Sequence, residues 1–90
     1  MTHKVDTNQA EIVEALRAVG ASVQSLAMVG HGVPDLLVAY RGDLFLFEVK
    51  APSLIVLTEN ERNWHANWHS PVHIITTVDA ALHIIGAVEA

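Results

Sequence analysis

Cysteine is absent from the 90-residue chain, which excludes both a disulfide framework and a thiolate zinc site. The sequence also lacks any apolar run close to the roughly 20 residues that span a bilayer. Its first residues, Met-Thr-His-Lys-Val-Asp, contain no apolar signal-peptide core. We therefore expect a cytoplasmic protein without a membrane partner.

Basic residues are scarce as well. The chain has five Lys and Arg against ten Asp and Glu, a formal net charge of -5, whereas a protein that binds DNA through a basic surface has the opposite balance. Hydrophobic residues make up 51% of the chain and charged residues 17%, which favours a compact fold with both sheet faces covered. Ninety residues suit one domain, residues 1–90, with a core small enough that we expect a homodimer.

Hydrophobic periodicity predicts an α/β order of elements. A first helix is expected from Asn8 to about Val19, capped by Thr7 or Asn8 and ended by Gly20. The apolar run 54–57 fits a strand extension, a partner surface or packing of a connection equally well. The remaining pattern predicts strands over 21–26, 35–40, 43–50 and 72–75, a helix capped by Thr58 and ended by Ser70-Pro71, and a last helix over 78–85.

The most informative segment is a predicted β-hairpin. Arg41-Gly42 forms a turn-compatible pair between two apolar, β-prone runs. If these two residues make the whole loop, Tyr40 pairs with Asp43, and counting back places Asp35 opposite Glu48. Directly opposed side chains have Cβ atoms about 5 Å apart, so two like charges there repel each other unless a cation lies between them.

Lys50 extends this cluster, because it lies two residues after Glu48 and projects from the same face of the strand. Together Pro34-Asp35 and Glu48-Val49-Lys50 resemble the motif of the PD-(D/E)xK nuclease superfamily. Within it the chain resembles the VRR-NUC group, whose small members are similar to phage and archaeal Holliday-junction resolvases. The matching segments run from residues 8–13 to Leu57-Thr58, and so cover most of the chain.

The resemblance implies a restriction-endonuclease-like αβββαβ core with a mixed central sheet flanked by helices. It also implies a Mg²⁺-dependent endodeoxyribonuclease, with Mn²⁺ as a substitute, that cuts branched DNA such as a Holliday junction in a bacterium or a phage-infected host. An isologous dimer would match the two symmetric scissile positions of such a junction. The alternative is a non-catalytic module that keeps the nuclease fold for DNA binding or assembly, which the acidic charge favours.

In this interpretation Asp35, Glu48 and the backbone carbonyl of Val49 are the metal ligands, since oxygen donors suit Mg²⁺. Asp35, Glu48 and Lys50 are the catalytic residues. Lys50 orients or deprotonates the attacking water, or stabilises the charge that develops on the phosphate.

Three further residues are supporting candidates. Gln9 stands where related nucleases carry a glutamate on the first helix, so it either assists the ion through its amide oxygen or only begins the helix. Glu61, where relatives often have glutamine, either approaches the site or is an exposed carboxylate that favours a helix N-terminus. His31, between two glycines, either contacts a phosphate or is a mobile surface histidine.

Two more side-chain pairs have helical spacing. His65 and His69 lie four residues apart, a spacing that can bind zinc, but no third ligand is evident nearby in the sequence. Trp64 and Trp68 are expected to pack in the core or at a dimer interface rather than to stack on bases.

Overall fold

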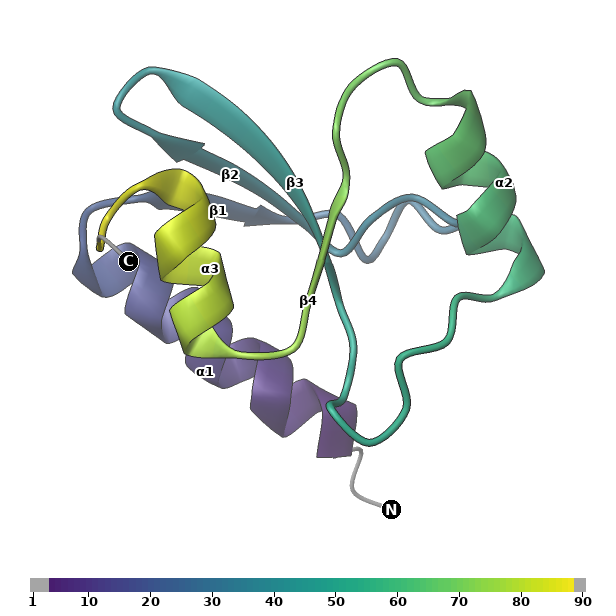
Figure 1. Ribbon diagram of the computed structural model, residues 1–90, viewed down its shortest axis with the longest axis horizontal. Helices are drawn as coiled ribbons and strands as arrows, with labels where there is room; N and C mark the ends of the chain where they lie inside the picture. The colour runs from purple at the N-terminus through teal and green to yellow at the C-terminus, as the bar shows by residue number, and fades with distance from the viewer. Residues whose placement is uncertain (1–3, 89–90) are drawn as a thin grey trace.

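A four-stranded mixed sheet organises the computed structural model, which describes residues 4–88 and the side chains from residue 8 onward (Figure 1). Its strand order is β1-β2-β3-β4, with the first three strands antiparallel and β4 parallel to β3. The predicted α/β class and the predicted mixed sheet are confirmed. The elements are α1 (Lys4–Ala18), β1 (Ser22–Ser25), β2 (Leu36–Tyr40), β3 (Asp43–Val49), α2 (Glu59–Asn67), β4 (His73–Ile75) and α3 (Val78–Ile85).

The β2–β3 hairpin forms as predicted. Arg41 and Gly42 have φ angles of 52° and 87°, both positive, as a two-residue type I′ turn requires. Tyr40 consequently pairs with Asp43, and the same register runs back to the pair Leu36 and Phe47. Because this turn type matches the natural twist of the two strands, local sequence alone determines which side chains face each other.

The core lies on one face of the sheet. Ile12 and Leu16 of α1 and Ala81 and Ile85 of α3 pack in one cluster against the inward side chains of the strands. The two helices lie together on the same side of the sheet in Figure 1. The strand residues of this cluster are Leu36, Val38, Tyr40, Phe47, Val49 and Ile75.

The opposite face is only partly covered, with Glu48 buried at one end, which corrects the expectation that both faces are covered. Leu44 is 72% exposed and Ile74 is 42% exposed. The reason is the placement of the helices, because α1 and α3 share the first face and α2 contains no buried residue. Figure 1 shows α2 standing apart from the other two helices. A high apolar content therefore does not by itself mean that both faces are covered.

Several predicted boundaries are corrected. α1 begins at Lys4, so Thr7 and Asn8 lie inside the helix and neither is its cap. Its end is as predicted, since Gly20 adopts φ +97° and its N–H donates to the carbonyl of Arg17 at 3.0 Å. α2 ends at Asn67, before Ser70.

The apolar run 54–57 is a connection, not a strand. Leu54, Ile55 and Val56 are exposed, and the only pairing nearby is an isolated bridge between Ala51 and Leu54. No helix within residues 4–88 is long and apolar enough to cross a membrane.

Candidate active site

Asp35 and Glu48 meet at the end of the hairpin. One step beyond the pair Leu36 and Phe47, the register places these two carboxylates opposite each other. The Val49 N–H donates to Asp35 Oδ2 at 2.7 Å, which fixes that carboxylate against β3. Glu48 is 2% exposed and is the buried charged residue of the described chain. The hairpin thus holds one carboxylate by a main-chain hydrogen bond and buries the other.

Burial next to a like charge changes the titration of Glu48. Burial raises its pKa, and the charge of Asp35, a hydrogen bond with Asp35 and the charge of Glu61 raise it further. Lys50 acts in the opposite direction, and the resulting pKa is about 9. Without a cation, Glu48 therefore holds a proton at neutral pH.

Lys50 projects from the same face of the chain as Glu48. Its Nζ lies 2.8 Å from Glu61 Oε1 and 3.7 Å from Glu48 Oε2. Burial lowers the pKa of Lys50, but the hydrogen bond to Glu61 and the surrounding carboxylate charges outweigh it, so the pKa is raised overall. Lys50 is therefore an ammonium at neutral pH, which suits charge stabilisation better than proton abstraction from water.

Glu61 belongs to the cluster and also begins α2. Its Oε1 accepts hydrogen bonds from Lys50 Nζ and from the Thr58 N–H at 2.9 Å, while Thr58 Oγ1 accepts from the Glu61 N–H. This is a capping box, so the predicted cap at Thr58 is confirmed. Burial raises the pKa of Glu61, but the hydrogen bonds from Lys50 and Thr58 lower it more. Glu61 is thus brought to the site by its role in starting the helix.

His65 lies one turn after Glu61, and its position at the site was not predicted. Its Nε2 is 3.6 Å from Glu48 Oε1. Both atoms are buried and neither has a hydrogen-bond partner. The sequence signal was the four-residue spacing from Glu61, which places both side chains on one face of α2.

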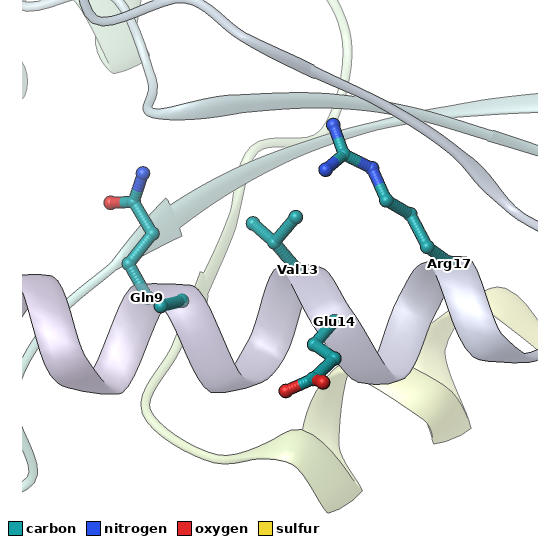
Figure 2. A pocket seen from close by; sticks show the side chains of 5 residues that line it. Gln9, Val13, Glu14 and Arg17 are labelled. Atoms are coloured by element: carbon teal, nitrogen blue, oxygen red, sulfur yellow. The ribbon is translucent and has the colours of Figure 1, made fainter.

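The contact from α1 comes from Asn8 and not from Gln9. Asn8 Nδ2 donates to the Lys50 carbonyl oxygen at 2.9 Å, which ties the helix to the end of β3. Asn8 continues the buried stripe of Ile12 and Leu16 at four-residue intervals. Gln9 follows the neighbouring stripe and lines a hollow on α1 that contains no residue of the hairpin motif (Figure 2).

The residues that line this hollow all belong to α1. Gln9, Val13 and Arg17 point to one side of the helix, while Glu14 points to the other (Figure 2). Asn8 was therefore the residue missed on the first helix, because an apolar stripe that includes both Ile12 and Val13 leaves the helix phase open by one residue.

His31 lies in the loop before Asp35, next to α2. It has a φ angle of 59° and is exposed, and it lines a hollow with Trp64 and Trp68. The neighbouring Gly32 makes the close approach to α2, because a Cβ built there would clash with the Asn60 carbonyl oxygen. The loop before Asp35 thus fits against α2 only because residue 32 has no side chain.

We expect Gly32→Ala to disturb the docking of α2 more than Gly30→Ala does. Both glycines have positive φ angles, so each alanine meets backbone strain of about 1–2 kcal/mol. A Cβ at Gly30 meets nothing within 4 Å, whereas at Gly32 it clashes with α2. Gly32→Ala should therefore lower the free energy of unfolding by about 1–3 kcal/mol more.

Urea unfolding followed by tryptophan fluorescence measures this difference, since both tryptophans lie in or next to α2. Equal losses of stability in the two variants would mean that the approach of Gly32 to Asn60 does not hold α2 in place.

The remaining pairs with helical spacing have separate roles. Trp64 and Trp68 stack on each other with ring centroids 4.5 Å apart. Trp68 is exposed, so it does not pack in the core of a single chain, and its packing at a dimer interface stays a prediction. His65 faces Glu48, whereas His69 follows the end of α2. Across residues 4–88, no three side chains of His, Cys, Asp or Glu gather closely enough to hold an ion by themselves.

The chain matches no family model, no curated protein and no solved structure, so its function has to be inferred from the site itself.

Proposed function

We propose that the chain is a metal-dependent endodeoxyribonuclease with a restriction-endonuclease-like core. The observation that carries this proposal is the pairing of Asp35 with the buried Glu48 at the end of a hairpin, with Lys50 on the same side. A fold gains no stability from burying two neighbouring carboxylates, so the arrangement is explained best by a cation that binds them. The element order, helix, three strands, helix and strand, is also that of the proposed core.

The residues present fit Mg²⁺ or Mn²⁺ as the resident ion. The donor set is chemically suitable, because two facing carboxylates meet at the end of the hairpin and oxygen donors are those that Mg²⁺ prefers. Mg²⁺ commonly binds one or two carboxylates and completes its coordination with water and substrate phosphate, so two carboxylates suffice. Asp35, Glu48 and the Val49 carbonyl would hold the ion, which when bound polarises the phosphate and lowers the pKa of water.

The chain's own residues supply positioning and charge. Asp35 is held in place by the Val49 N–H, and Glu48 would exchange its proton for a bound cation. Lys50 is an ammonium with donors beyond the one directed at Glu61, so it can stabilise negative charge on the phosphate oxygens or orient the attacking water. Glu61 holds the Lys50 ammonium 3.7 Å from Glu48 Oε2.

Branched DNA is the proposed substrate, and the support for it is the resemblance to small resolvase-like nucleases. A homodimer would present two copies of this site in the two-fold symmetry of a four-way junction. The chain has five Lys and Arg against ten Asp and Glu, so we expect DNA affinity that is weak and falls steeply with salt.

The test is cleavage of a labelled four-way junction and a matched linear duplex in Mg²⁺ or Mn²⁺, with EDTA as the control. We expect paired, symmetric cuts in the junction, no cuts in the duplex, and complete loss of cleavage in EDTA. Cleavage of neither substrate with either ion would count against the nuclease, while equal cleavage of both would retain the nuclease and remove the preference for branched DNA.

One observation favours a second candidate, a non-catalytic module that binds DNA or assembles with a partner. The Lys50 ammonium is already neutralised by Glu61 at 2.8 Å, and the chain carries a net charge of -5. This module would bind the junction in a gel-shift assay without cutting it, and binding would be unchanged in EDTA. The nuclease, in contrast, would cut the junction, and EDTA would abolish its activity.

A further inference from the structure

Two contacts connect α2 to the end of β3 in matching order. Glu61 Oε1 meets Lys50 Nζ, and one helical turn later His65 Nε2 lies near Glu48 Oε1. The four residues from Glu61 to His65 advance about 6 Å along a helix, and the two residues from Glu48 to Lys50 advance about 6.6 Å along a strand. The spacings are nearly equal, so both pairs can form at the same time. The later helix residue meets the earlier strand residue, as it does when the two segments run in opposite directions.

The second contact is incomplete. Glu48 Oε1 and His65 Nε2 are both buried, and each lacks a hydrogen-bond partner. Neighbouring donors lie closer to other acceptors, because the Val49 N–H donates to Asp35 and the Lys50 ammonium is near Glu61 Oε1 and the other Glu48 oxygen, Oε2. Leaving a buried polar atom unpaired is unfavourable, and here two such atoms lie 3.6 Å apart. Each is therefore the natural partner of the other.

We infer that His65 is a positioning residue, which donates its Nε2–H to Glu48 Oε1 and so orients the other carboxylate oxygen toward the ion. This inference rests on the proposed function. The present distance exceeds a hydrogen bond of about 3.2 Å only slightly, and contacts of this kind often tighten when the site is loaded.

The described side chains do not favour the imidazole as a direct metal ligand. Within the described part of the chain, no group of three His, Cys, Asp or Glu side chains could enclose an ion. His65 meets Glu48 through Oε1, whereas the Lys50 ammonium lies near Oε2, 3.7 Å away. A residue that orients a metal ligand changes metal affinity by about 10–100-fold, which is large enough to measure.

The experiment is calorimetric titration of the full chain with Mn²⁺, and in parallel with Mg²⁺. His65→Ala should weaken the affinity for both ions about 10–100-fold. His65→Gln keeps an N–H donor at a similar reach, so its affinity should stay within several-fold of the unaltered chain. His69→Ala is the matched control, because His69 follows the same helix but is exposed, and its affinity should not change. Circular dichroism of each variant verifies that the fold is intact.

The outcomes separate this inference from the proposed function. If Asp35→Asn loses Mn²⁺ binding but His65→Ala binds normally, the positioning role is overturned and the nuclease proposal stands. If His65→Gln is as weak as His65→Ala, and both lose more affinity for Mn²⁺ than for Mg²⁺, the imidazole is a ligand and the positioning role is again overturned. If the unaltered chain binds neither ion and cuts no DNA, both proposals fail together.

Discussion

Asp35→Asn is expected to lower the rate of Mg²⁺-dependent junction cleavage about 1000-fold, equivalent to about 4 kcal/mol of transition-state stabilisation. Asn has nearly the same shape, and its side-chain oxygen can still accept from the Val49 N–H, which Asp35 Oδ2 now does at 2.7 Å. The fold should therefore survive, while the negative charge needed by the cation is lost. Single-turnover cleavage of a labelled junction measures the effect.

Asp43→Asn is the matched control for that experiment. Asp43 is an exposed aspartate at the turn end of the same hairpin, opposite Tyr40 and away from Glu48. The Asp43→Asn variant loses the same charge as Asp35→Asn but is unchanged at the site. Its cleavage rate should therefore stay close to that of the unaltered protein. A comparable loss in both variants would attribute the effect to overall charge, and Asp35 would lose its assigned role.

The second large effect concerns stability against pH without metal. Glu48 has a pKa of about 9 in the folded chain and an ordinary value of 4.5 when unfolded. Between these values the unfolded chain releases the proton while the folded chain keeps it, so the free energy of unfolding falls as pH rises. The slope from this group approaches about 1.4 kcal/mol per pH unit, and it vanishes below 4.5 and above 9.

Glu48→Gln isolates this contribution, because an amide stays neutral at every pH. In EDTA, the variant should be as stable as the unaltered chain near pH 4.5 and increasingly more stable toward pH 8. Urea unfolding at several pH values gives both curves, and their difference cancels the other titrating groups. Saturating Mg²⁺ should reverse the order, because only the unaltered chain is stabilised by binding the ion.

Glu11→Gln is the control for losing one negative charge, since Glu11 is exposed on α1. If the Glu48→Gln and Glu11→Gln curves run parallel across this range, then the burial of Glu48 beside Asp35 does not govern the pH dependence. A parallel result would also remove the electrostatic reason for placing a cation there.

The hairpin was predictable because its register depends on adjacent residues alone. The turn at Arg41-Gly42 fixes the pairing, and the pairing fixes Asp35 opposite Glu48. The phase of α1 was less certain, because Ile12 and Val13 are both apolar and only packing against the sheet decides which one faces the core. That difference of one residue exchanges Asn8 for Gln9 at the site.

The contribution of α2 lay beyond local sequence rules. Thr58 and Glu61 predict where the helix starts, but their spacing does not predict where the helix docks. The docking of α2 includes the close approach of Gly32 to Asn60 and the meeting of Lys50 with Glu61, contacts between segments distant in sequence. The place of His65 beside Glu48 follows from them.

The absence of buried residues from α2 has a consequence for how the molecule opens. The carboxylates belong to a hairpin whose next residues are core, whereas Glu61 and His65 belong to a helix that contributes no buried side chain. Local unfolding free energy increases with buried apolar contact, so α2 should detach as a separate cooperative unit well before the sheet does. Each detachment would expose Glu48 to water and release Lys50 from Glu61, leaving the hairpin's half of the site in place.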